Sequence, residues 1–171
     1  MKSRAIALFA IAALVCLLPA AGSALTMYSQ DFEGLVQSDT GALAADGWLV
    51  FGNVFSPAGD YLYGYGVFPA PNDGGGFCAI ALGEGGPDQG AQQLVAFSDY
   101  NNGDHAIGNL IESNVFQEQS IAAGDVGQTW TFEFDAKMGN LAGGSTAAAF
   151  IKTLDPNNGY ATTNFVTFDT T

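Results

Sequence analysis

The sequence predicts an all-β domain, a sandwich or a barrel, and three observations carry this prediction. Short runs of aromatic and β-branched residues alternate with clusters of Gly, Asn, Asp and Pro, which form turns. The run QTWTFEFDAK at 128–137 alternates apolar and polar residues, so Trp130, Phe132 and Phe134 are expected on one face of a strand. No sustained helical period follows the first two dozen residues, so little helix is expected.

Nine segments are expected to form strands. The first, 26–32, leads into Glu33, and an extended chain would place Asp31 and Glu33 on the same side. The second, 47–55, lacks clean alternation, which predicts burial on both faces or a bulge at Gly52. The predicted strands are 26–32, 47–55, 61–68, 77–82, 92–97, 114–121, 128–138, 146–153 and 163–169.

Residues 1–24 are predicted to be a signal peptide. Two basic residues precede an uninterrupted apolar run at 6–18, and small residues follow up to Ala24, where cleavage is expected. The apolar run, about 13 residues, is short for a bilayer span, although an uncleaved anchor is the alternative. Residues 25–171 are expected to form one secreted domain, extracellular, at the cell surface or in the periplasm, without membrane insertion after cleavage.

The charge of the mature chain restricts its partners. Cleavage leaves Lys137 and Lys152 as the cationic side chains against 17 acidic residues, a formal charge of 2 − 17 = −15. This charge repels phosphates and anionic lipids, so nucleic acid is not expected as a partner, while cations and neutral polymers stay open. One cysteine, Cys78, remains in an apolar run, which predicts a buried side chain and excludes an intramolecular disulfide.

The segment ESNVFQEQSIAAGDVGQTWTFEFDAKMG, at 112–139, resembles the galactose-binding-like jelly-roll family. It is similar to the sugar-binding modules of secreted bacterial glycanases, in which a Gln-containing strand precedes a Gly and a strand of alternating aromatics. The stretches QDFEGL and DGWLVFGNV are similar to the first strand and first long loop of these modules. Together these stretches cover about half of the mature chain. The resemblance implies an antiparallel jelly-roll β-sandwich that binds carbohydrate without catalysis.

The same resemblance implies a structural calcium that joins the first strand to the last. An acidic residue of the first strand and a late strand-borne Asp supply oxygen ligands in these modules, and Asp31 and Glu33 match the first half of this arrangement. The closing strand that would carry the late Asp has no counterpart before Thr171, so Asp169 is the substitute candidate. A member of the family that is truncated at its C-terminus is therefore expected.

A row of tyrosines is the candidate ligand surface. Tyr61, Tyr63 and Tyr65 would share one face of an extended segment, where flat rings can stack on the apolar faces of successive sugar units. The polar candidates come from the turn SDYNNGD, and they are Asp99, Asn101 and Asn102. In the alternative interpretation, the tyrosines form a core face with their hydroxyl groups at its rim, and the turn is an ordinary one.

Catalysis has little support in the sequence. His105 is the single histidine, and no G-x-S-x-G nucleophile motif is present. Carboxylate pairs for glycoside hydrolysis can be drawn from 17 acids in many ways, and none is favoured by position. The expected function is binding of a neutral glycan. A structural or adhesive surface domain is the first alternative, and a glycoside hydrolase is the second.

Overall fold

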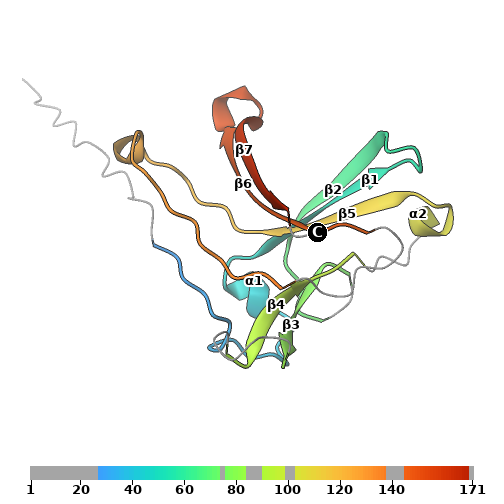
Figure 1. Cartoon of the computed structure of the whole chain (residues 1–171), viewed down its shortest axis with the longest axis horizontal. Helices are drawn as coiled ribbons and strands as arrows, with labels where there is room; N and C mark the ends of the chain where they lie inside the picture. The colour runs from blue at the N-terminus through green and yellow to red at the C-terminus, as the bar shows by residue number, and fades with distance from the viewer. Residues whose placement is uncertain (1–26, 74–75, 84–89, 99–102, 138–144, 170–171) are drawn as a thin grey trace, which may run out of the picture. The chain divides into compact units, whose positions relative to one another are not determined.

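A computed structural model describes residues 27–73, 76–83, 90–98, 103–137 and 145–169 (Figure 1). The predicted all-β class is confirmed, because the described strands form antiparallel sheets and helix is limited to short turns. The predicted signal peptide lies outside the described residues. None of the helices in the described part of the chain has the length and apolar character needed to cross a membrane.

The chain divides into two compact units. In the first, the described residues are Met27 and Gln119–Gln128, which contain the 3₁₀ turn η1 (Ala123–Asp125). The second unit holds Tyr28–Glu118 and Thr129–Thr171, and it contains every described strand.

The described strands of the second unit form three antiparallel sheets. Sheet A has the order β2-β1-β5, sheet B pairs β3 with β4, and sheet C pairs β6 with β7. Two four-residue helices, α1 and α2, and the 3₁₀ turn η2 occupy connections. The bounds are α1 Ala42–Ala45, β1 Leu49–Phe55, β2 Tyr61–Pro69, β3 Cys78–Leu82, β4 Gln92–Ala96, α2 Gly103–Ala106, β5 Leu110–Phe116, β6 Ala148–Asp155, η2 Pro156–Asn158 and β7 Ala161–Asp169.

Strand β1 is the centre of sheet A, and it alternates strictly in burial. Val50, Gly52 and Val54 are buried, while the residues between them are half-buried. Segment 47–55 is thus not buried on both faces, and both bulges of the β1–β2 pair lie on β2 rather than at Gly52. Gly52 is required for another reason, because a Cβ atom there would lie 2.4 Å from the ring of Tyr65.

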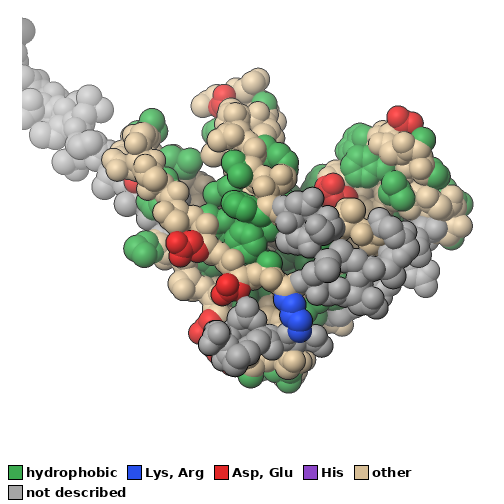
Figure 2. Space-filling view, in the orientation of Figure 1, with side chains coloured by type: hydrophobic (Ala, Val, Ile, Leu, Met, Phe, Trp, Pro, Cys, Tyr) green, Lys and Arg blue, Asp and Glu red, His purple; other side chains and the backbone are tan. Residues whose placement is uncertain are grey.

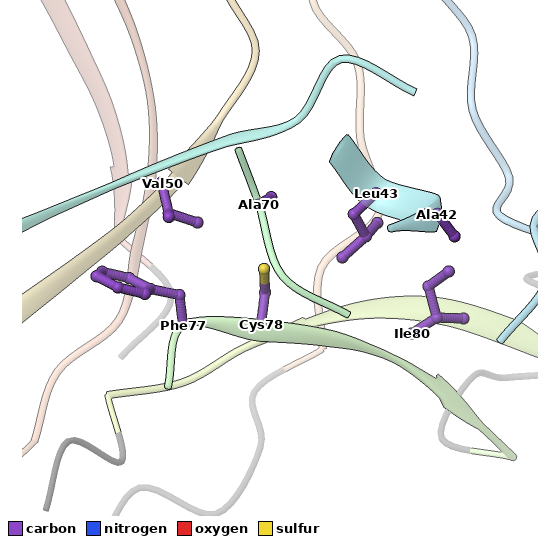
Figure 3. Close-up of a cluster of buried hydrophobic side chains, with 7 residues drawn as sticks. All are labelled: Ala42, Leu43, Val50, Ala70, Phe77, Cys78 and Ile80. Carbon is purple, nitrogen blue, oxygen red and sulfur yellow. The ribbon is translucent and has the colours of Figure 1, made fainter. Parts of the chain in front are cut away.

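The buried cluster lies between sheet A, helix α1 and sheet B (Figure 3). Figure 3 shows Val50 from β1, Leu43 from α1 and Cys78 from β3 directed toward a common centre. Leu94 of β4 and Val115 of β5 pack against this cluster from its edges. One face of sheet A and one face of sheet B therefore share a core, as expected for layered β architecture.

Two predicted strands are absent from the described chain. Residues 27–31 have no ladder partners, and a turn follows in which Phe32 has a positive φ of 65°. Residues 128–137 are likewise unpaired, although their alternation is the strictest in the sequence. The predictions at 26–32 and 128–138 are therefore wrong over the described residues, because a pattern favours a strand but the ladder bonds need a partner.

Sheet C and segment 129–135 carry exposed apolar side chains. Figure 2 shows hydrophobic side chains exposed on the surface, and several belong to sheet C or to segment 129–135. The rings of Phe132 and Phe134 lie 5.2 Å apart, and Phe134 lies 5.5 Å from Phe168 of β7. The exposed members are Trp130, Phe132, Phe134, Ile151, Phe165, Val166 and Phe168.

Candidate functional site

The tyrosine row of β2 is split between the two faces of sheet A. Tyr61 is opposite Phe55, and Tyr63 is opposite Val54, so Leu62 is the extra residue of a bulge. Opposed residues share a face, and successive residues of β1 point to opposite faces. Tyr61 therefore lies on the face opposite to Tyr63, and the predicted single row of three rings is wrong.

The second and third tyrosines belong to the core side of the sheet. Tyr65 is half-buried, and its ring centroid lies 6.1 Å from that of Phe77 and 6.2 Å from that of Tyr63. The hydroxyl of Tyr63 donates a hydrogen bond to Asp104 of α2, and this bond raises the pKa of Tyr63. Asn109 donates to the other oxygen of Asp104 at 3.0 Å, so the carboxylate is held by two neutral donors.

The predicted polar partners Asp99, Asn101 and Asn102 lie outside the described residues. Asp104 follows two residues after Asn102 and lies in α2, and its hydrogen bond with Tyr63 joins α2 to β2. Asp104 thus fills the role of a polar neighbour to a tyrosine, but on the core side of the sheet.

The opposite side of sheet A, which we term the outer face, is an aromatic surface beside a polar row. Its aromatic members are Phe51, Phe55 and Tyr61, with the ring centroids of Phe55 and Tyr61 5.8 Å apart at 73°. Gly64 and Gly66 occupy the same face of β2, and a Cβ atom on either would meet the ring of Phe51 at 3.0 Å or less. The glycines therefore let that ring lie flat against the strand.

The polar row of the outer face is centred on Glu112. Asn53 of β1 lies opposite Glu112 of β5 and donates to its Oε1 at 2.7 Å. Asn114, two residues along β5, donates to the same oxygen at 2.9 Å and to the carbonyl of Phe51 at 3.3 Å. Glu112 is exposed and the two amides are half-buried, so the amides hold the carboxylate from the sheet side while solvent reaches it.

The sequence does not single out these outer-face residues. The signal was present in 49–55, where aromatic and polar residues at Phe51, Asn53 and Phe55 alternate with small ones. Each face of β1 contains apolar residues, so the sequence shows no clear alternation of apolar and polar positions. The pairing with Glu112 depends on the β1–β5 register, which joins segments 59 residues apart in the chain.

The acidic pair at the N-terminal turn has a structural use. Asp31 accepts a hydrogen bond from the backbone N–H of Glu33 at 3.0 Å, which closes the turn around Phe32. The Glu33 carboxylate accepts from the backbone N–H of Gln92 at 2.6 Å, and the amide of Gln92 donates to the carbonyls of Phe32 and Leu35. Asp31 therefore shapes the turn, and Glu33 joins it to β4.

Of the predicted calcium ligands, Asp31 and Glu33 lie in the N-terminal turn and Asp169 lies at the end of β7. Asp31 and Glu33 do not lie on one side of a strand as predicted, because a turn at Phe32 replaces that strand. The backbone of Asp169 ends β7, and its side chain is not described. Within the described ranges, no three Asp, Glu, His or Cys side chains are grouped to hold a metal.

Asp46 organises the surface beside the core. Its Oδ2 accepts hydrogen bonds from the hydroxyl of Tyr28 at 2.7 Å, the amide of Gln30 at 2.8 Å and the indole N–H of Trp48 at 3.2 Å. Burial and, next, the bond to Asp46 raise the pKa of Tyr28. A shallow hollow of about 270 Å³ adjoins Asp46, lined by Gly34, Leu35, Val36, Asp39, Ala42, Ala45 and Asp46. It has no aromatic lining residue, so it offers no ring on which a sugar could stack.

Comparison with known proteins finds no relative: no family model matches the chain, and no curated protein or solved structure matches it. The resemblance to sugar-binding modules therefore stays a prediction from residue patterns.

Cys78 is the nucleophilic side chain of the core, and its surroundings make it inert. It is fully buried, and its thiol donates to the carbonyl of Pro71 at 3.2 Å. Burial first, and then the charge of Asp73, raise the pKa of Cys78 from 9.0 to about 12. The expectation of a buried cysteine is confirmed.

The raised pKa of Cys78 predicts a loss of stability in alkali. The folded pKa is higher than the unfolded one, so the contribution is fully present below pH 9 and is lost as pH rises toward about 12. Chemical denaturation across this range should show that the free energy of unfolding falls by up to about 4 kcal/mol more in the wild type than in Cys78→Ala. The variant controls for the tyrosines, which titrate in both proteins. Parallel curves would contradict the prediction, as would fast labelling of the native thiol at pH 8.

Proposed function

We propose that the chain is an exported, non-catalytic domain that binds a neutral carbohydrate on the outer face of sheet A. The signal peptide predicted at 1–24 would direct export, and the acidic composition disfavours anionic partners. The observation that carries the proposal is the juxtaposition of aromatic rings with a carboxylate held by two amides on one open sheet face.

The chemistry of this face suits a sugar. Pyranose rings present apolar C–H patches that stack on aromatic rings, and Tyr61 is 58% exposed beside the half-buried ring of Phe55. Sugar hydroxyls need acceptors and donors close to that ring, and Glu112 and the amide of Asn53 supply both. An open sheet face suits an internal segment of a polysaccharide, because the polymer can extend past the site in both directions.

A binding role agrees better with this face than hydrolysis does. Glycosidases use two carboxylates that flank the scissile bond. Glu112 is the one carboxylate that the described strands of sheet A contribute to the outer face. It is also already held by two amides, which favours recognition over proton transfer.

An adhesive surface domain is the second candidate function. It is favoured by the exposed apolar side chains of sheet C and segment 129–135, because contiguous apolar surface commonly marks interaction sites. In that case the outer face of sheet A would have no small ligand.

Tyr61 separates these two functions. Replacement of Tyr61 by Ala should weaken binding to a retained neutral polysaccharide at least tenfold, since the variant loses stacking energy of about 1.4 kcal/mol or more. Tyr61→Phe should retain binding. Tyr63→Ala is the matched control, because it removes the same ring from the other face and should leave binding unchanged. Affinity electrophoresis in a panel of neutral polysaccharides measures the effect. No retention of the wild type in any gel would reject the function, and equal retention of Tyr61→Ala would reject the site.

We further propose that the fold is a jelly-roll sandwich, as the resemblance implies. The core that sheet A and sheet B share supports a layered β arrangement of this kind.

Calcium is a separate proposal. We propose that Asp31 and Glu33, which retain carboxylate oxygens at the N-terminal turn, supply part of a calcium site, with Asp169 as the further candidate. A bound ion would raise the melting temperature through linkage, so added calcium should raise it relative to chelated protein by several degrees. Magnesium at equal concentration controls for screening of the net charge. Superimposable melts with calcium and with chelator would remove the metal.

A further inference from the structure

The Glu112 carboxylate is oriented by its neighbours before any ligand arrives. The side-chain amides of Asn53 and Asn114 both donate hydrogen bonds to Oε1, at 2.7 Å and 2.9 Å. No donor from the described residues reaches Oε2, and the Glu112 side chain is exposed. The side chain therefore presents one fixed acceptor oxygen to solvent, and its rotamer entropy is already lost.

Aromatic residues lie on either side of this acceptor. Asn53, opposite Glu112, has Phe51 and Phe55 as its same-face neighbours along β1. Diagonal neighbours of this kind lie about 7 Å apart, within reach of large side chains. A sugar stacked on Tyr61 and lying along Phe55 toward Asn53 would thus bring its hydroxyl edge toward Glu112.

We propose that Glu112 is the specificity-determining residue of this site and that it selects uncharged polyols against uronic acid sugars. This inference rests on the proposed carbohydrate function and deepens it. A hydroxyl can donate to the open Oε2, whereas a ligand carboxylate at the same position would place two anions at contact distance. The described cations, Lys137 and Lys152, belong to no strand of sheet A, so no positive side chain of its strands offsets this repulsion.

Contact repulsion at Glu112 can be distinguished from the general charge of the chain. The whole chain carries a formal charge of −13, which would also disfavour an anionic ligand at a distance. Salt screens distant charges, with a Debye length of about 10 Å at 0.1 M and roughly 4 Å at 0.5 M, but it weakens a contact pair much less. Discrimination by Glu112 should therefore survive in high salt, and discrimination by net charge should not.

The test compares ligands that differ only in charge. The probes are hexasaccharides of β-1,4-linked glucose and mannose, each paired with the hexasaccharide of the same backbone oxidised to the uronate at C6. Calorimetry in about 0.1 M and about 0.5 M NaCl gives the affinity ratio of each pair. The wild type should bind the neutral member at least tenfold more tightly at both salt concentrations.

Variants of Glu112 assign the discrimination to this residue. Glu112→Gln keeps an acceptor of the same shape without the charge, so the ratio in high salt should fall to less than threefold. Glu112→Ser is the second variant if the first is unstable. Glu118→Gln, which removes one exposed charge beyond the end of β5, should keep the wild-type ratio.

The outcomes separate this inference from the function on which it rests. A wild type that binds neither member of either pair would remove both proposals for these glycans. A wild type that binds the neutral and uronate members equally in high salt would overturn the role of Glu112 and leave carbohydrate binding intact. A tenfold ratio that persists in Glu112→Gln would also overturn it.

Discussion

The buried amide of Asn72 is the interaction on which the core depends. It is 5% exposed, and its Nδ2 donates to the carbonyls of Gln37 at 3.0 Å and Asp39 at 2.8 Å. Its Oδ1 accepts from the backbone N–H of Ile80 at 2.6 Å. One side chain thus joins the turn before α1 to β3. A buried backbone group without its partner costs about 1–3 kcal/mol, so these bonds compare with a large share of the stability of a small domain.

This bridge fixes the layers that carry the candidate site. With the turn held against β3, α1 places Leu43 over Cys78, and both pack on Val50 of β1. Val50 then defines the inner face of sheet A, and the strict alternation of β1 sends Phe51 to the outer face. The position of the outer face is therefore a consequence of core packing several residues away.

A bulge, two glycines and the strand register determine which side chains lie on the outer face. The bulge at Leu62 moves Tyr61 to this face, and without it the three tyrosines would point to the core side. Glycines at 64 and 66 leave room for the ring of Phe51. The β1–β5 register then places Asn53 opposite Glu112. The set of side chains on this face thus depends on backbone geometry more than on any motif.

Composition and local alternation are properties of single segments, so they were enough to predict the β class, the acidic character and the buried cysteine. The inward position of Phe32 was also predictable from its apolar side chain between two acids, although a turn rather than a strand holds it. The folded chain alone shows that Tyr61 and Tyr63 lie on opposite faces of sheet A, that residues 128–137 lack a ladder partner, and that Glu112 lies opposite Asn53. Each of these depends on register and bulges between distant segments, and such long-range pairing is set by the whole core rather than by the local pattern.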